Sequence, residues 1–181
     1  YIIYIYIYIY IYMGGSKWSQ QILNDTLTFI IKLLNDNNIN NWFIAYGTLL
    51  GIARENSCIN GDDDIDIVID NTNYEKVKNM LADNGIEVNY NYNNRTVKSK
   101  DILKTKEVQD TYCSVDFYMA SLDENGNFRD KWEGVTWSKC YDANNNLIEY
   151  MWNENKLYLP FNYETKIINR YGENWKTPQN N

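Results

Sequence analysis

Apolar residues recur at three- and four-residue steps between residues 16 and 35, which predicts an amphipathic helix with one buried face. The repeat consists of Trp18, Ile22, Leu23, Leu27, Ile30, Ile31 and Leu34. Residues 36–41 are rich in Asp and Asn, a composition typical of turns, so we expect the helix to end there.

Short apolar segments alternate with further helical patterns along the rest of the chain, and this order predicts an α/β fold. The segment 42–46 predicts a buried strand that ends at Gly47. Strands are also expected at 65–69, 86–90 and 113–120, and helices at 48–55, 74–83 and 162–171. The segment after residue 90 is polar and contains lysines through residue 108, an Asn-Gly turn is expected at 123–126, and 132–158 is assigned only to short strands and loops.

The first twelve residues alternate almost perfectly between Tyr and Ile. A translated TATATA tract gives this pattern, and Met13 follows it directly. We therefore interpret 1–12 as low-complexity sequence outside the fold, and 13–181 as a single domain. An edge strand is the alternative, because period-2 runs of aromatic and β-branched residues favour strands. The tract is shorter than the roughly 20 apolar residues of a membrane-spanning helix, and it lacks the basic start of a signal peptide.

Composition narrows the classes of function. Hydrophobic residues make up 44% of the 181 residues, as expected for a folded globular domain. The net charge of -7 argues against non-specific binding to nucleic acid, which requires a basic surface. An acidic protein that acts on phosphorylated substrates must bring cations to its site, and a bound metal is the most direct means.

The chain contains no histidine and only three widely spaced cysteines, Cys58, Cys113 and Cys140. This argues against a zinc site of Cys and His ligands and against a Ser-His or Cys-His nucleophile. Catalysis must therefore depend on carboxylates, metals, Lys, Tyr or the backbone.

The segment 47–69 combines a glycine, a hydroxyl residue and an acidic strand. Gly47 and Thr48 are expected at the start of a helix, where backbone N–H groups can bind phosphate oxygens. Asp64 and Asp66 are expected on one face of a strand, because strand side chains alternate with period 2. Two carboxylates on one face can share divalent ions that neutralise a phosphate.

Asp116 is the expected third acid, because it lies between apolar residues in the predicted strand 113–120. If this strand pairs beside 65–69, Asp116 lies near Asp64 and Asp66. It could then ligate Mg²⁺ and take a proton from an attacking hydroxyl. The alternatives are ordinary ones: the acidic run Asp62-Asp63-Asp64 as a solvated loop, and Gly47-Thr48 as a helix cap.

The segment YGTLLGIARENSCINGDDDIDI resembles the signature of the LicD/fukutin-related family of the nucleotidyltransferase superfamily. A second, weaker match lies in LYLPFNYETKIINRYGENWKTP. The resemblance implies the nucleotidyltransferase fold, with a mixed central sheet flanked by helices. The chain departs from the family at Asn60-Gly61, where members commonly have an aromatic or Pro-Trp pair, and this departure concerns the shape of the donor pocket.

The resemblance also implies a function: transfer of a phospho-alcohol, such as phosphocholine or ribitol phosphate, from a CDP-linked donor to a saccharide hydroxyl, with release of CMP. It further implies an Mg²⁺ or Mn²⁺ site formed by Asp64, Asp66 and Asp116. Gly47 and Thr48 would form the turn that contacts the phosphate, and Arg54 would be a charge partner for the donor. An ion pair with Glu55 is the alternative for Arg54.

Two other functions stay open on the sequence. One is a nucleotidyltransferase that moves NMP from an NTP and releases pyrophosphate, and the other is a catalytically inactive binding module. We expect no nucleic-acid partner and find no membrane contact in the sequence. The compartment stays open between the cytoplasm and a secretory lumen reached through an N-terminal anchor outside this chain.

Overall fold

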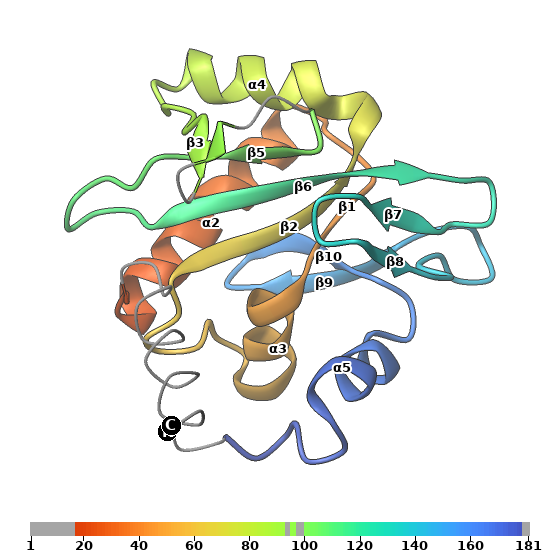
Figure 1. The fold of residues 1–181 in the computed structure, drawn as a ribbon. Coiled ribbons are helices and arrows are strands. Elements are labelled where there is room, and N and C mark those ends of the chain that lie inside the picture. Colours follow the sequence, from red (N-terminus) through yellow and green to blue (C-terminus); the bar gives the residue numbers. More distant parts are fainter. Residues whose placement is uncertain (1–16, 93–94, 97–99, 179–181) are drawn as a thin grey trace, which may run out of the picture.

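The computed structural model describes residues 17–92, 95–96 and 100–178. A mixed six-stranded sheet forms its centre, and helices lie on both sides of this sheet (Figure 1). The strands of this sheet are β1 (Trp42–Ile44), β2 (Asp64–Asp70), β5 (Ile102–Lys104), β6 (Ser114–Leu122), β7 (Phe128–Asp130) and β8 (Val135–Trp137). The helices are α2 (Gln20–Asp36), α3 (Tyr46–Glu55), η1 (Asn71–Asn73), α4 (Tyr74–Asp83) and α5 (Tyr163–Tyr171). Two separate hairpins are formed by β3 (Asn91–Tyr92) with β4 (Arg95–Thr96), and by β9 (Ile148–Trp152) with β10 (Asn155–Leu159).

The two long strands, β2 and β6, run parallel to each other in the middle of the sheet. β1 pairs antiparallel with the other edge of β2, and β5 pairs antiparallel with β6. β7 pairs antiparallel with the end of β6, and β8 pairs antiparallel with β7. Most of the backbone groups of β2 and β6 therefore lie inside the sheet, which fixes the register between these two strands.

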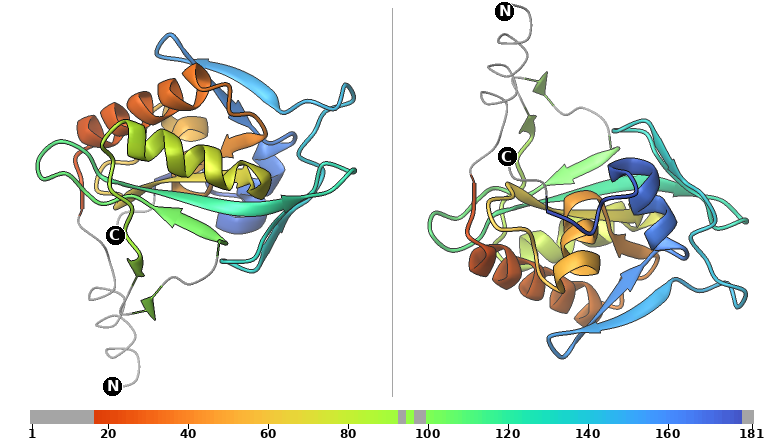
Figure 2. Two further views of the ribbon diagram at one scale, coloured as in Figure 1. Left: turned by 90° about the horizontal axis from the view of Figure 1, so that it is seen from above. Right: turned by 90° about the horizontal axis from the view of Figure 1, so that it is seen from below.

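Side chains of β2 alternate between the two faces of the sheet. Ile65 and Ile67 are fully buried and lie opposite Val115 and Phe117 of β6. α2 and the β9–β10 hairpin lie on one side of the sheet, whereas α5 lies on the other (Figure 2). The main apolar layer therefore lies on the isoleucine face, and the intervening acids of β2 are directed to the opposite face.

An aromatic cluster fills part of that opposite face. Phe43 of β1 makes edge contacts with Phe128 and Trp137, at centroid distances of 5.1 and 5.3 Å. Tyr46, at the start of α3, contacts Tyr118 and Trp137 in the same way, at 5.0 and 5.2 Å. Such edge-to-face pairs add stability beyond the burial of their area. The cluster thus fixes the start of α3 against β6 and β8.

Several predicted boundaries agree with the structure and others do not. The helix predicted at 74–83 is confirmed as α4. α2 begins at Gln20 rather than at residue 16, because the hydroxyl of Ser19 caps it by accepting the Ile22 N–H at 3.3 Å. The prediction of a strand at 86–90 is wrong, since only an isolated bridge between Val88 and Thr105 forms there.

The segment between residues 90 and 108, for which the sequence indicated only a polar and lysine-containing character, contains the strand β5. The tract at 1–12, interpreted as lying outside the fold, lies outside the described residues. In the described part of the chain, no helix combines the length and the apolar character needed to cross a membrane.

The packing of α3 against the following loop gives a stability prediction. A Cβ atom added to Gly51 would lie 2.6 Å from the backbone oxygen of Ser57 and 3.0 Å from the backbone nitrogen of Ile59. Because backbone cannot easily move away, Gly51→Ala should lower the free energy of unfolding by about 1–3 kcal/mol. Chemical denaturation measures the change.

Gly47→Ala is the matched control in the same helix. Its added Cβ would meet the carboxylate end of Asp62 at 2.6 Å, and that side chain can rotate away. We therefore expect a smaller loss of stability than for Gly51→Ala. Equal losses in the two variants would contradict this packing of α3.

Candidate active site

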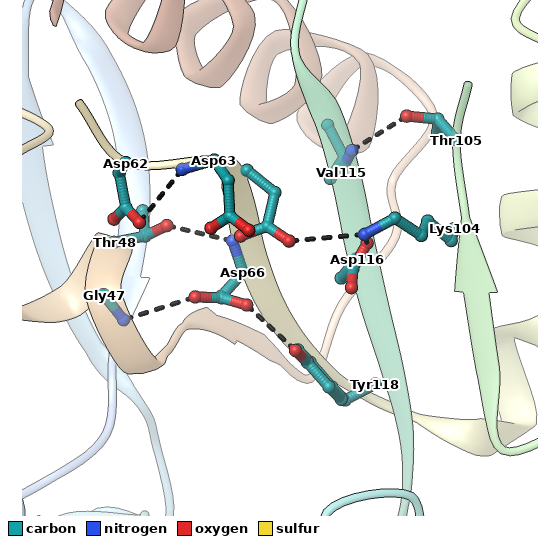
Figure 3. A network of polar contacts seen from close by, with 11 residues as sticks. Gly47, Thr48, Asp62, Asp63, Asp66, Lys104, Thr105, Val115, Asp116 and Tyr118 are labelled. Atoms are coloured by element: carbon teal, nitrogen blue, oxygen red, sulfur yellow. Dashed lines mark hydrogen bonds and ion pairs between the residues drawn. The ribbon is translucent and has the colours of Figure 1, made fainter. Parts of the chain in front are cut away.

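The parallel pairing of β2 and β6 places two of the predicted acids side by side. Asp66 is the direct Cα partner of Asp116, and Asp64 is the partner of Ser114. Directly paired residues point to the same face, and Asp64 shares that face because it precedes Asp66 by two residues. The prediction that strand 113–120 lies beside strand 65–69 is therefore confirmed, and Asp66 and Asp116 lie close together on these strands (Figure 3).

Asp66 connects β2 to the start of α3. Its Oδ2 accepts the N–H of Gly47 at 3.2 Å, and its Oδ1 accepts the hydroxyl of Tyr118 at 3.0 Å. Its own N–H donates to the hydroxyl of Thr48 at 2.9 Å (Figure 3). Gly47 and Thr48 therefore lie at the acids, with the positive end of α3 directed to them. Their contact with a phosphate stays a prediction.

Lys104 of β5 reaches the same group of acids. Its Nζ lies 2.8 Å from Oδ1 of Asp116 and 3.3 Å from Oδ2 of Asp64. These side chains are mostly buried, with exposed fractions of 15% for Lys104 and 2% for Asp116. The ammonium of Lys104 is therefore the partner of this buried Asp116 oxygen.

Burial of the three carboxylates changes their acidity. Burial raises the pKa of Asp116 to about 7, with a further contribution from the charge of Asp64, while Lys104 acts in the opposite direction. Burial raises the pKa of Asp66 well above its usual range, and the charges of Asp64 and Asp116 raise it further. The pKa of Asp64 is raised by burial and lowered by Lys104. The ionised forms are therefore costly here, and a cation would stabilise them.

A second group of acids lies at the entrance to β2. Carboxylate oxygens of Asp62, Asp63 and Asp64 all lie within 4.8 Å of one another, a spacing that a metal ion could bridge. Burial raises the pKa of Asp62 to about 6. Asp64 thus belongs to both groups. From the sequence, Asp62 and Asp63 could either contribute to the metal site or orient the loop.

Arg54, the predicted charge partner of the donor, lies in the last turn of α3. Its Nε donates to Oε1 of the neighbouring Glu55 at 2.7 Å, which is the alternative considered from the sequence. Arg170 of α5 lies nearer the start of α3, with its guanidinium 4.4 Å from the ring centroid of Tyr46. Among the described residues, no carboxylate forms an ion pair with Arg170.

Sequence reasoning missed two residues of this site, Tyr118 and Lys104, and a third residue, Arg170, beside the start of α3. Tyr118 could have been found, because it follows Asp116 by two residues and so shares its face. Lys104 follows the apolar pair Ile102-Leu103, a weak strand signal. Nothing local marks Arg170, which reaches Tyr46 only through the packing of α5 against α3.

Comparison with known proteins places the chain in a family. The model of the LicD/FKTN/FKRP nucleotidyltransferase domain matches residues 39–169, which is most of the chain. The chain belongs to the LicD/FKTN/FKRP family. The resemblance stated from the sequence is thereby confirmed, and the protein is a transferase of the LicD family. No match is found among curated protein sequences.

One solved structure, LnuA, supports the fold of this LicD domain. The lincosamide antibiotic adenylyltransferase LnuA, solved with lincomycin bound, has a TM-score of 0.53 at 17% identity, over 86% of this chain and 88% of that chain. The antibiotic-resistance factor ANT(2'')-Ia has a TM-score of 0.49 at 14% identity, over 75% of this chain and 66% of that chain. The likeness to LnuA shows that the LicD domain has the nucleotidyltransferase fold, as predicted.

The raised pKa of Asp116 predicts how stability depends on pH. Between the unfolded value near 4 and the folded value of about 7, the native protein binds more protons than the unfolded chain. Without added metal, the free energy of unfolding should therefore fall as pH rises through this window, by up to about 1.4 kcal/mol per pH unit for each such group. Urea denaturation at pH 5 and at pH 7.5, with a chelator present, measures this fall.

Asp116→Asn tests the assignment, because its amide cannot ionise. The variant should lose less stability than the wild type between the two pH values. An identical fall in both proteins would show that Asp116 does not carry the raised pKa.

Proposed function

We propose that this LicD-family transferase moves a phosphorylated alcohol from a CDP-linked donor to a saccharide hydroxyl and releases CMP. The observation that carries the proposal is the register of β2 and β6. It gathers Asp66 and Asp116, with Asp64 on the same face, at the start of α3. Buried carboxylates beside a helix N-terminus are suited to hold a cation and a phosphate together.

Asp64, Asp66 and Asp116 are the ligands that we propose for Mg²⁺ or Mn²⁺. The site fits such an ion, because all the donors are carboxylate oxygens and the buried Oδ1 of Asp116 already lies beside a cation, the ammonium of Lys104. The ammonium of Lys104 between two of these carboxylates indicates that a cation is stabilised there. When bound, a divalent ion would neutralise the diphosphate of the donor and stabilise charge that develops during transfer.

The residues of the chain supply the remaining steps. The N–H groups at the start of α3, beginning with Gly47, bind oxygens of the transferred phosphate. Asp116 accepts the proton of the attacking saccharide hydroxyl. The new bond joins that oxygen to the phosphorus of the phospho-alcohol, and the bond from this phosphorus to the CMP oxygen breaks. Arg170, beside Tyr46, provides positive charge for the nucleotide phosphate.

Donor turnover tests the proposal. Purified protein is incubated with Mn²⁺, a panel of oligosaccharides and either CDP-choline, CDP-ribitol or CDP-glycerol, and CMP release is measured. We expect acceptor-dependent CMP release with one of these donors. Asp64→Asn, Asp66→Asn and Asp116→Asn should each lower kcat by at least about 100-fold, because each removes a charged metal ligand.

Asp70→Asn is the matched control. Asp70 is a buried acid at the far end of β2, where its Oδ1 accepts the Thr72 N–H at 3.1 Å. Asparagine keeps that acceptor oxygen, so this variant should retain activity. Equal loss in Asp70→Asn and Asp66→Asn would indicate a general effect on the sheet instead of a catalytic site.

Nucleotidyl transfer from an NTP is the second candidate, because LnuA is described as an adenylyltransferase and shares the fold. Pyrophosphate release from ATP or CTP, without CMP release from CDP donors, would favour it. An inactive binding module is the third. Failure of the wild type to bind Mn²⁺, or unchanged Mn²⁺ affinity in Asp64→Ala, would favour that reading over both enzymes.

A further inference from the structure

Lys104 takes no part in the proposed transfer steps. Its ammonium lies between Asp64 and Asp116, which are also proposed as metal ligands. The oxygens concerned are Oδ2 of Asp64 and Oδ1 of Asp116, at 3.3 and 2.8 Å. To ligate a metal ion, a carboxylate oxygen at this distance from an ammonium must either leave the ammonium or contact both cations.

The position of Lys104 is fixed by the sheet. β5 pairs antiparallel with β6, and Lys104 is the direct Cα partner of Asp116. The side chain therefore starts beside Asp116, on the edge of β6 away from β2, and is directed towards β2 (Figure 3). Its Nζ reaches Oδ2 of Asp64. Only 15% of the side chain is exposed, so the ammonium is poorly screened by water.

We propose that Lys104 is an internal counter-ion that competes with the divalent metal for Asp64 and Asp116. The inference rests on the metal site of the proposed function. A metal ion and an ammonium a few ångströms apart repel each other strongly in a mostly buried site. Metal binding therefore requires the ammonium to turn away from at least one of the two carboxylates. Lys104 compensates the buried acids when no metal is bound, and it lowers metal affinity.

Metal titration of a charge-removal variant tests the competition. Lys104→Met keeps most of the apolar stem and removes the charge. Calorimetric titration with Mn²⁺ at pH 8, where protons compete least, should show binding at least about tenfold tighter than in the wild type. A lysine that only supports the structure of the site would give the opposite result, weaker binding on removal.

Lys106→Met is the matched control. Lys106 lies two residues further along the chain, has a side chain that is 54% exposed and pairs with Glu87. Its removal changes the net charge by the same amount as Lys104→Met, so a difference between the two variants reports the position of the charge. We expect its Mn²⁺ affinity to stay within about twofold of the wild type, because exposed charges are well screened.

A second measurement is made on the wild-type sequence, and a variant serves only to assign the signal. In protein labelled with ¹³C at the lysine Cε, saturation with Mg²⁺ should shift the resonance of Lys104 and leave that of Lys106 in place. The spectrum of Lys104→Arg assigns the Lys104 signal. An unmoved Lys104 resonance at saturating Mg²⁺ would overturn the inference.

The outcomes separate this inference from the proposed function. Wild type that binds Mn²⁺ and releases CMP, with unchanged or weaker Mn²⁺ binding in Lys104→Met, would overturn the competition alone. Wild type that binds no Mn²⁺ would overturn both. Tighter binding in Lys104→Met with no CMP release from any donor would support the competition and contradict the proposed reaction.

Discussion

Parallel pairing of β2 with β6 is the constraint on which the site depends, because it holds Asp66 directly beside Asp116 in a buried position. Two carboxylates in such a place repel each other and lose hydration. The fold offsets this with the N–H of Gly47, the hydroxyl of Tyr118 and the ammonium of Lys104. Burial of these acids destabilises the protein when no cation is present, and such an arrangement is expected of a site that binds cations.

Other parts of the molecule maintain that register. The isoleucines of β2 anchor the strand in the apolar layer, so a shift by one residue would bury the acids in the core. On the opposite face, the aromatic cluster around Tyr46 positions α3, so that its first N–H groups meet Asp66. The same residue, Tyr46, also supports Arg170. The first residues of α3 thus belong both to the packed core and to the candidate site.

Much of this arrangement could be predicted because its signals are local. Period-2 alternation placed Asp64 and Asp66 on one face, and the apolar neighbours of Asp116 marked a strand that the structure confirms beside them. Other contacts arise between distant segments. β5 has only three residues, Ile102–Lys104, and its place beside β6 has no local signal. Tertiary packing likewise decides that Arg170, and not Arg54, lies beside Tyr46.

In the proposed site, acids from two neighbouring strands hold divalent ions against a phosphate. A crystal structure of the protein with Mn²⁺ and CDP, with manganese located by its anomalous scattering, tests it most directly. We predict a manganese ion about 2 Å from oxygens of Asp64, Asp66 and Asp116, in contact with the diphosphate of CDP. Manganese bound only by Asp62 and Asp63, with Asp116 still paired to Lys104, would contradict the claim.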